Sequence, residues 1–297
     1  MAHTGGETAQ DAVHLQAAAP AAGAARLAGV ETMHHLGLPA AVARAEFADV
    51  RFVCVGGTDE RARGIAEAIS AKSGLPVREL SRGRFIVFKV GHTITASHGM
   101  GGPSISIALN ELIQALIIAE NCRDVTFFRV GTTGGIGIKP GTAVLTTEAL
   151  NEMLEPFYEV IYMGKRVQYP TKIATEVVKE LLHYPNVATG KTMTANCFYE
   201  NQGRVDGAFC DHTEADKKAF LQRLSEAGVR NIEMEVVPFS AIVSRAGLRA
   251  VACCTVLVNR LEGEHVENLP NGNYALEVVA DYIAKKEQAQ TVVPRST

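Results

Sequence analysis

Runs of apolar residues divide the chain into short strands that alternate with amphipathic helices. Continuous apolar runs, typical of buried strands, occur at 51–57, 125–130 and 248–260. Two further runs within 84–97 predict a strand pair, and 142–150 predicts another strand. Helical spacing predicts helices near 58–73, 104–120, 172–183, 213–227 and 274–288. The alternation predicts an α/β fold, with three layers built around one central sheet.

The first thirty residues differ in composition from the remainder. They are rich in alanine, and Pro20 and Gly23 interrupt any helix. No basic start followed by an apolar block is present, so a secretory signal is not expected. We therefore expect a flexible extension over 1–30 and a single domain over 31–297, with no internal repeat.

Composition and charge exclude several classes of protein. The 297 residues are 47% apolar and carry a net charge of −3, which excludes a disordered chain and gives no electrostatic reason to expect nucleic acid or an anionic membrane as partner. No run of about 18 apolar residues exists, so no membrane span is expected. Six cysteines without a CxxC pair indicate free thiols and a cytoplasmic location.

The stretch FFRVGTTGGIG (127–137) carries the first candidate site. Arg129 lies at the end of a predicted strand, and a loop of glycines and threonines is expected to follow it over 131–135. Glycines let the backbone approach a ligand, and hydroxyl and N–H groups donate hydrogen bonds, so the pattern indicates a small anion. A tight turn with a surface arginine is the alternative.

A second candidate anion site follows the strand at 51–57. Arg61 lies in the first turn of the next predicted helix, where the helix dipole disfavours a cation unless an anion lies between them. The spacing of the glycines matches neither the dinucleotide fingerprint nor the P-loop.

Two polar pairs later in the chain complete the candidate chemistry. Gln202 and Arg204 would project to one side of an extended stretch, where an amide and a guanidinium can bind the edge of a planar ring; solvated loop side chains are the alternative. Glu233 and Glu235 enter an apolar helix and need a buried partner. An anion site, a carboxylate pair and a ring-binding pair together suit glycosidic transfer from a heterocycle to phosphate. No HExxH motif is present, and no metal site is expected.

Several motifs in one order resemble a known family. VGG with Arg61, SHGMGGPSISI, FFRVGTTGGIG, FYENQGR and NIEMEV are similar to the uridine phosphorylases of the nucleoside phosphorylase-I superfamily, over about Met33 to Tyr282. The resemblance implies a single three-layer α/β domain with a central mixed β-sheet. It also implies reversible phosphorolysis of uridine to uracil and ribose 1-phosphate, with deoxyuridine and thymidine as further candidate substrates.

The resemblance also implies a role for each matching residue. No cofactor is implied, since inorganic phosphate is a co-substrate. The implied assembly is a homodimer in which His35 and Arg84 act in the active site of the partner subunit. The phosphate ligands would be Gly57, Arg61, Arg129, Thr132 and the partner's Arg84, and the ribose ligands would be Met234, Glu235 and, at the 5′-hydroxyl, the partner's His35. The base would contact Phe198, Gln202, Arg204, Gly134, Leu257 and Val266, Thr132 would also contact the nucleoside, and the catalytic set would be Arg61, Arg84, Arg129, Gln202, Arg204 and Glu235.

Departures from the family pattern keep alternatives open. Cys197, Val236 and His34 replace residues frequent in the family, so a non-catalytic nucleobase-binding paralogue is the main alternative. Asn259 stands where purine phosphorylases place an aspartate, which favours a pyrimidine. Phe85 stands where bacterial relatives bind a monovalent cation through a glutamate, so no such ion is expected. The arginine cluster argues against a nucleosidase, and the missing GxGxxG argues against a dehydrogenase.

Overall fold

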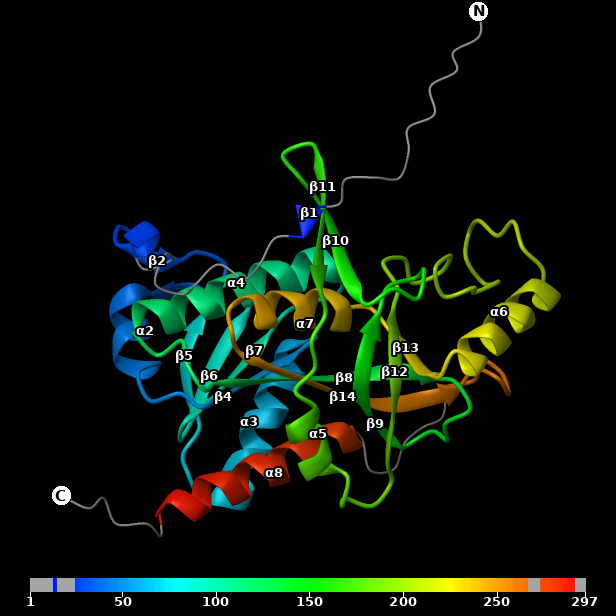
Figure 1. The fold of residues 1–297 in the computed structure, drawn as a ribbon. Coiled ribbons are helices and arrows are strands. Elements are labelled where there is room, and N and C mark those ends of the chain that lie inside the picture. Colours follow the sequence, from blue (N-terminus) through cyan, green and yellow to red (C-terminus); the bar gives the residue numbers. More distant parts are fainter. Residues whose placement is uncertain (1–12, 15–24, 267–272, 292–297) are drawn as a thin grey trace, which may run out of the picture.

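A nine-stranded mixed β-sheet lies at the centre of the computed structural model, which describes residues 13–14, 25–266 and 273–291 (Figure 1). The strand order is β13-β12-β9-β14-β8-β4-β7-β6-β5. In chain order the strands are β4 (Phe52–Gly56), β5 (Arg78–Arg82), β6 (Ile86–Val90), β7 (Thr93–Ser97), β8 (Thr126–Gly135), β9 (Ala143–Leu150), β12 (Val187–Thr194), β13 (Val229–Glu233) and β14 (Arg249–Asn259). β4, β6 and β7 are buried along their whole length, because helices cover both faces of the sheet.

The helices form the two outer layers (Figure 1). One hydrophobic cluster joins the sheet to α2 (Ala40–Glu46), α4 (Gly102–Ile118) and α7 (Val236–Arg245). A second cluster joins the opposite face to α3 (Asp59–Ser73), α5 (Thr175–Leu181) and α8 (Tyr274–Thr291), and α6 (Glu214–Glu226) packs beside β13. The predicted three-layer α/β fold around a central mixed sheet is confirmed.

Local sequence signals account for the ends of the helices. The Thr58 hydroxyl accepts a hydrogen bond from the backbone N–H of Arg61 and so caps α3, which ends at Gly74 in the left-handed conformation. Thr213 and Asp216 form the predicted capping box of α6. These signals fix where α3 begins, and hence where Arg61 lies.

One end of the sheet closes on itself. Besides its neighbours β14 and β4, β8 pairs with β13 in an antiparallel register, with Asn231 opposite Gly135. The strands β8, β14, β9, β12 and β13 thereby form a closed ring of pairings. This closure brings the second half of β8 beside the start of α7, where Glu235 lies.

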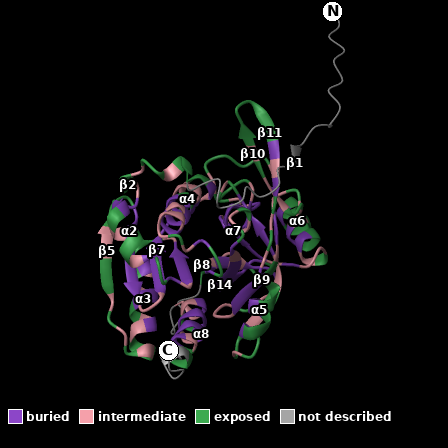
Figure 2. Cartoon of the chain, turned by 60° about the vertical axis from the view of Figure 1, so that its left-hand side comes forward, coloured by how far each residue is buried: buried purple, intermediate pink, exposed green. Residues whose placement is uncertain are grey.

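One prediction about local structure is wrong, and one element was not predicted. The loop expected over 131–135 continues β8 to Gly135, because β14 and β13 pair with it and satisfy its backbone hydrogen bonds despite the low strand propensity of glycine. The unpredicted element is the hairpin of β10 (Phe157–Tyr162) and β11 (Lys165–Pro170), whose tip is exposed (Figure 2).

The remaining short strands lie outside the main sheet: β1 (Val13–His14) pairs with β11, and β2 (Thr32–Met33) pairs with β3 (Leu38–Pro39). Residues 1–12 and 15–24 of the predicted extension lie outside the described residues, and the division at residue 30 stays a prediction. No helix within the described ranges is long and apolar enough to cross a bilayer.

Candidate active site

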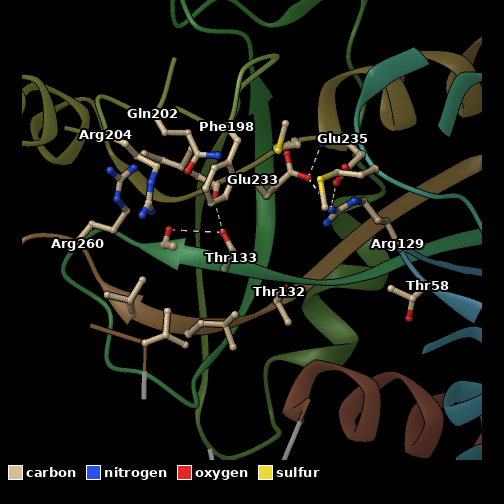
Figure 3. Close-up of a pocket in the computed structure, with 18 of the residues that line it drawn as sticks. Thr58, Arg129, Thr132, Thr133, Phe198, Gln202, Arg204, Glu233, Glu235 and Arg260 are labelled. Atoms are coloured by element: carbon tan, nitrogen blue, oxygen red, sulfur yellow. Dashed lines mark hydrogen bonds and ion pairs between the residues drawn. The ribbon is translucent and has the colours of Figure 1, made fainter. Parts of the chain in front are cut away.

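A cavity of about 290 Å³ opens where β8 and β14 end beside the starts of α3, α4 and α7 (Figure 3). Every predicted site residue except His35 and Arg84 lines it. These lining residues are Gly57, Arg61, Arg129, Thr132, Gly134, Phe198, Gln202, Arg204, Met234, Glu235, Leu257 and Val266. The structure therefore brings together residues as far apart in the sequence as Gly57 and Val266.

Arg61 provides an unpaired cation at one end of the cavity. Its side chain lies over two glycines: a Cβ at Gly56 would be 2.9 Å from Arg61 Cγ, and one at Gly57 would be 3.3 Å from a terminal guanidinium nitrogen. No described residue accepts a hydrogen bond from its guanidinium. Burial, and then the charge of Arg129, lower the pKa of Arg61. An anion bound here would relieve this repulsion.

Arg129 provides a second, more deeply buried cation in the middle of β8. Its guanidinium pairs with Glu235 and lies 2.9 Å from a carboxylate oxygen of Glu233, and it donates to Cys254 Sγ at 2.9 Å. Burial alone would lower the pKa of Arg129, but Glu233 and Glu235 outweigh it and raise the pKa. Its buried Nε has no partner in the described part of the chain. Arg129 therefore stays charged and is held in one orientation.

The two glutamates have separate tasks. Glu233 accepts hydrogen bonds from the backbone N–H of Glu235 at 2.8 Å, the N–H of Val236 at 3.0 Å and the Thr194 hydroxyl at 2.7 Å, so it holds the start of α7. Glu235 lines the cavity and accepts the Gly101 N–H at 2.6 Å. Burial opposes its ionisation, but Arg129 outweighs burial and lowers its pKa. An ionised carboxylate accepts hydrogen bonds, as the hydroxyls of a sugar require.

The other end of the cavity carries an aromatic ring, an amide and a guanidinium. The guanidinium carbon of Arg204 lies 4.7 Å from the centre of the Phe198 ring, and its Nε donates to Asp206 at 2.9 Å. Gln202 is 6% exposed, and its amide has no hydrogen-bond partner among the described residues. The extended conformation expected for this segment is wrong, because Gly203 has a φ of +62° and forms a turn. Gln202 and Arg204 nevertheless line the same cavity (Figure 3).

Comparisons with known proteins agree with this geometry. Residues 51–292 match the family model described as "Phosphorylase superfamily". Uridine phosphorylase 1 of Mus musculus is 42% identical over 241 residues, which are 76% of this chain and 76% of that protein. The crystal structure of uridine phosphorylase from Schistosoma mansoni in complex with uracil matches with a TM-score of 0.83 at 35% identity, covering 89% of this chain and 99% of that chain.

The chain belongs to the uridine phosphorylase family. A further relative, "Inactive uridine phosphorylase B" of Schistosoma mansoni, is 38% identical over 249 residues, which are 80% of this chain and 84% of that protein. Membership of the uridine phosphorylase family therefore does not by itself establish catalysis, which depends on the residues present in the cavity.

The lining residues of this uridine phosphorylase family member that were not predicted include three with ionisable side chains: His98, Arg260 and Glu264. His98 is 1% exposed, and neither of its ring nitrogens has a hydrogen-bond partner within the described residues. Burial, and then Arg129, lower its pKa to about 3. The motif SHGMGG, which includes His98, indicated only the start of a helix.

Arg260 and Glu264 form an ion pair at the end of the cavity that carries Phe198, Gln202 and Arg204. Arg260 donates to one Glu264 oxygen from two nitrogens, at 3.0 and 3.1 Å, and Lys217 Nζ lies 3.1 Å from the same oxygen. Arg204 reaches the other oxygen at 3.4 Å. Glu264 lies between the strand predicted over 248–260 and the helix predicted near 274–288, and no sequence signal pointed to it.

His35 and Arg84 lie away from this cavity but close to each other. The backbone oxygen of His35 accepts a hydrogen bond from the N–H of Phe85 at 3.1 Å, and both Arg84 and His35 expose their side chains at least in part. In the uridine phosphorylase family pattern these two residues act in the site of a second subunit. Their separation from the cavity agrees with that pattern, and their roles stay predictions.

Proposed function

We propose that this protein catalyses the reversible phosphorolysis of uridine, and of deoxyuridine or thymidine, to the free base and the pentose 1-phosphate. One observation carries the proposal. A single cavity has the cations Arg61 and Arg129 at one end, the Glu235 carboxylate between, and Gln202 with Arg204 at the other end. This order matches phosphate, sugar and base in the two substrates.

The charges of the cavity suit the charges that develop in the reaction. As the glycosidic bond lengthens, the sugar becomes cationic and the departing pyrimidine becomes anionic. Phosphate held by Arg61, Arg129 and the backbone near Gly57 and Thr132 would stabilise the cationic sugar and then attack C1′. Gln202 and Arg204 would stabilise the anionic base. A preorganised donor of this kind contributes about 3–4 kcal/mol to the transition state.

Contacts with the substrate would come from both subunits of the dimer that we propose. Met234 and Glu235 would hold the ribose, Phe198 would stack on the base, and Gly134, Leu257 and Val266 would enclose it. A second copy of this chain would add the partner subunit's His35 at the 5′-hydroxyl and the partner subunit's Arg84 at phosphate. We further propose a cytoplasmic location, supported by six free cysteines.

The residue at position 259 favours a pyrimidine over a purine as the base. Purine phosphorylases use an aspartate in place of Asn259 to protonate the base. Here the side-chain oxygen of Asn259 accepts hydrogen bonds from the backbone N–H groups of Gly137, at 2.9 Å, and of Leu261, at 3.3 Å. An amide used in this way is a structural cap and offers no acidic proton.

The departures from the family pattern leave the ligand-facing side chains intact. Cys197 Sγ accepts the backbone N–H of Glu200 at 3.4 Å and so still caps the turn that carries Phe198. Val236 is buried at the start of α7, where its backbone N–H, and not its side chain, contacts Glu233. This retention favours an active enzyme over a non-catalytic nucleobase-binding paralogue.

The test is phosphate dependence across three nucleosides. Purified protein is incubated with uridine, thymidine or inosine, with and without phosphate, and the release of free base is measured. We expect uracil from uridine only when phosphate is present, and no hypoxanthine from inosine. Cleavage of inosine without cleavage of uridine would refute the proposal. Binding of uracil without turnover would support the non-catalytic paralogue.

A further inference from the structure

Glu111 is a carboxylate in the apolar part of α4. It is 8% exposed and lies among buried residues of that helix such as Leu109 and Leu112. Burying a carboxylate is costly unless hydrogen bonds compensate for the lost water. One oxygen accepts the His35 backbone N–H at 3.0 Å, and the other accepts the Leu36 N–H at 2.8 Å. A second contact of the first oxygen, with His35 Nδ1 at 2.6 Å, involves the imidazole ring itself.

The contact with the ring determines which nitrogen carries the proton. An ionised carboxylate can only accept hydrogen bonds, so Nδ1 of His35 must be the donor. In the neutral ring, Nε2 then has a lone pair and no hydrogen. No described residue pairs with Nε2, and the His35 side chain is 38% exposed.

We propose that Glu111 is a positioning residue that makes His35 a hydrogen-bond acceptor, so that the enzyme selects nucleosides carrying a donor at the 5′ position. This rests on the proposed function, in which the partner subunit's His35 contacts the 5′-hydroxyl. A 5′-hydroxyl can donate to Nε2. A 5′-hydrogen or a 5′-fluorine cannot, although fluorine is close to a hydroxyl in size.

A separate backbone contact joins His35 to the segment of Arg84. The His35 carbonyl accepts the N–H of Phe85, the residue after Arg84. A Cβ at Gly83 would lie 2.4 Å from that carbonyl oxygen, so the two segments pack too closely for any other residue there. These backbone contacts, which do not involve the Glu111 side chain, join into one unit the two segments predicted to enter the second subunit's site.

The helix α4 also connects this unit to the cavity of its own subunit. At the N-terminus of α4 the Gly101 N–H donates to Glu235, and near its middle Glu111 holds His35. A substitution at Glu111 could therefore act through a change in α4 as a whole, so the experiment needs a control substitution on the same helix. Asn110 offers a matched control, since its exposed side chain contacts only the backbone oxygen of Ser106 on the same helix among described residues.

The experiment compares kcat/KM of the wild type, E111Q, H35A and N110A for uridine, 5′-deoxyuridine and 5′-deoxy-5′-fluorouridine. Loss of one hydrogen bond that leaves a buried acceptor without its partner corresponds to a decrease of about 10- to 100-fold. We expect that decrease when E111Q or H35A acts on uridine, and when the wild type acts on either 5′ analogue. With 5′-deoxyuridine, E111Q should match the wild type within about 3-fold, as should N110A with uridine. An equal loss for E111Q on uridine and 5′-deoxyuridine would mean a purely structural role and would overturn the proposal, as would full activity of the wild type on the fluoro analogue.

A second measurement observes the ring in the wild-type protein and does not depend on turnover. In wild-type protein labelled with ¹⁵N-histidine, with the His35 signal assigned by its loss in H35A, the shifts should show a protonated Nδ1 and an unprotonated Nε2. The opposite tautomer would overturn the proposal. If the wild type shows this tautomer but does not cleave uridine, the proposed function has failed and the ring assignment stands.

Discussion

Arg61 and Arg129 bring like charges into one cavity, but only Arg129 has carboxylate partners in the described structure. Arg61 is therefore the residue whose charge is least compensated. We expect R61A to lower kcat/KM for phosphate by about 100- to 1000-fold, because a preorganised donor is lost, while uracil binding changes little. Steady-state kinetics with varied phosphate measures the loss, and calorimetry measures uracil binding.

The control for R61A lies two residues further along α3. Arg63 exposes its side chain and contacts Glu79 at 3.4 Å, away from the cavity. R63A should retain activity within about 2-fold. Equal losses in both variants would show that α3 responds to any lost arginine and would argue against a phosphate site at Arg61.

His98 gives a pH dependence of stability whose sign follows from its burial. Its pKa is about 3 in the fold, against 6.5 ordinarily. Between these values the unfolded chain binds a proton that the folded chain does not, so stability falls as the pH falls. From about pH 8 to about pH 5 this costs about 2 kcal/mol of the free energy of unfolding.

The variant H98N removes this titration without adding a charge. Urea unfolding at both pH values should show that H98N loses about 2 kcal/mol less than the wild type on acidification. Other titrating groups contribute equally to both proteins and cancel in the difference. The same pH dependence in both proteins would mean that His98 does not titrate in this window.

At the scale of elements, the segment after β14 is attached to the base end of the cavity through Glu264. Its carboxylate contacts Arg204, Lys217 and Arg260, which come from a loop, from α6 and from the end of β14. Burial opposes its ionisation, but Arg260 outweighs burial and lowers its pKa. One carboxylate therefore holds three cations at the position where the base would bind.

We expect E264Q to weaken uracil binding by about 10-fold, because Arg204 and Arg260 would repel each other and lose their orientation. Glu262 is exposed two residues earlier in the same segment, so E262Q is the matched control and should bind uracil like the wild type. Isothermal titration with uracil distinguishes the two variants. Unchanged binding in E264Q would show that the cations keep their positions without Glu264.

The sequence predicted elements well where one element alone carries a strong pattern. The capping signals at Thr58 and Thr213 placed α3 and α6 within a residue or two. The continuation of β8 through 131–135 could not be seen, because its hydrogen bonds come from strands that lie about a hundred residues further along the chain. The hairpin of β10 and β11 buries few residues, chiefly Val167 and Tyr169, and so has little apolar alternation.

The same reasoning applies to the candidate site. Residues beside glycines or at strand ends, such as Arg61 and Arg129, could be found because their local setting is unusual. His98 could not, because its burial beside Arg129 arises only in the fold. Glu264 could not, because its contact with Arg204 joins residues 60 positions apart. The tautomer of His35 likewise depends on Glu111, which is 76 positions away.

At the scale of the whole molecule, neither His35 nor Arg84 reaches the cavity of its own subunit. We expect R84A and E235A each to be nearly inactive, since each removes a ligand from every site of a homodimer. Mixed after subunit exchange, heterodimers would contain one intact site in two, so an equal mixture should regain about a quarter of the wild-type activity. No recovery after verified exchange would contradict a shared site.

The strand β8 spans the cavity from Arg129 to Gly134, with five intervals of about 3.3 Å between successive residues, or at most about 17 Å. Its length therefore sets the distance between the proposed anion site and the proposed ring site. Inserting or deleting one residue would change that distance and would also turn the following side chains to the opposite face of the sheet. A ligand of another size is thus expected to be accommodated by changes in the loops at either end, and not by a change in the length of β8.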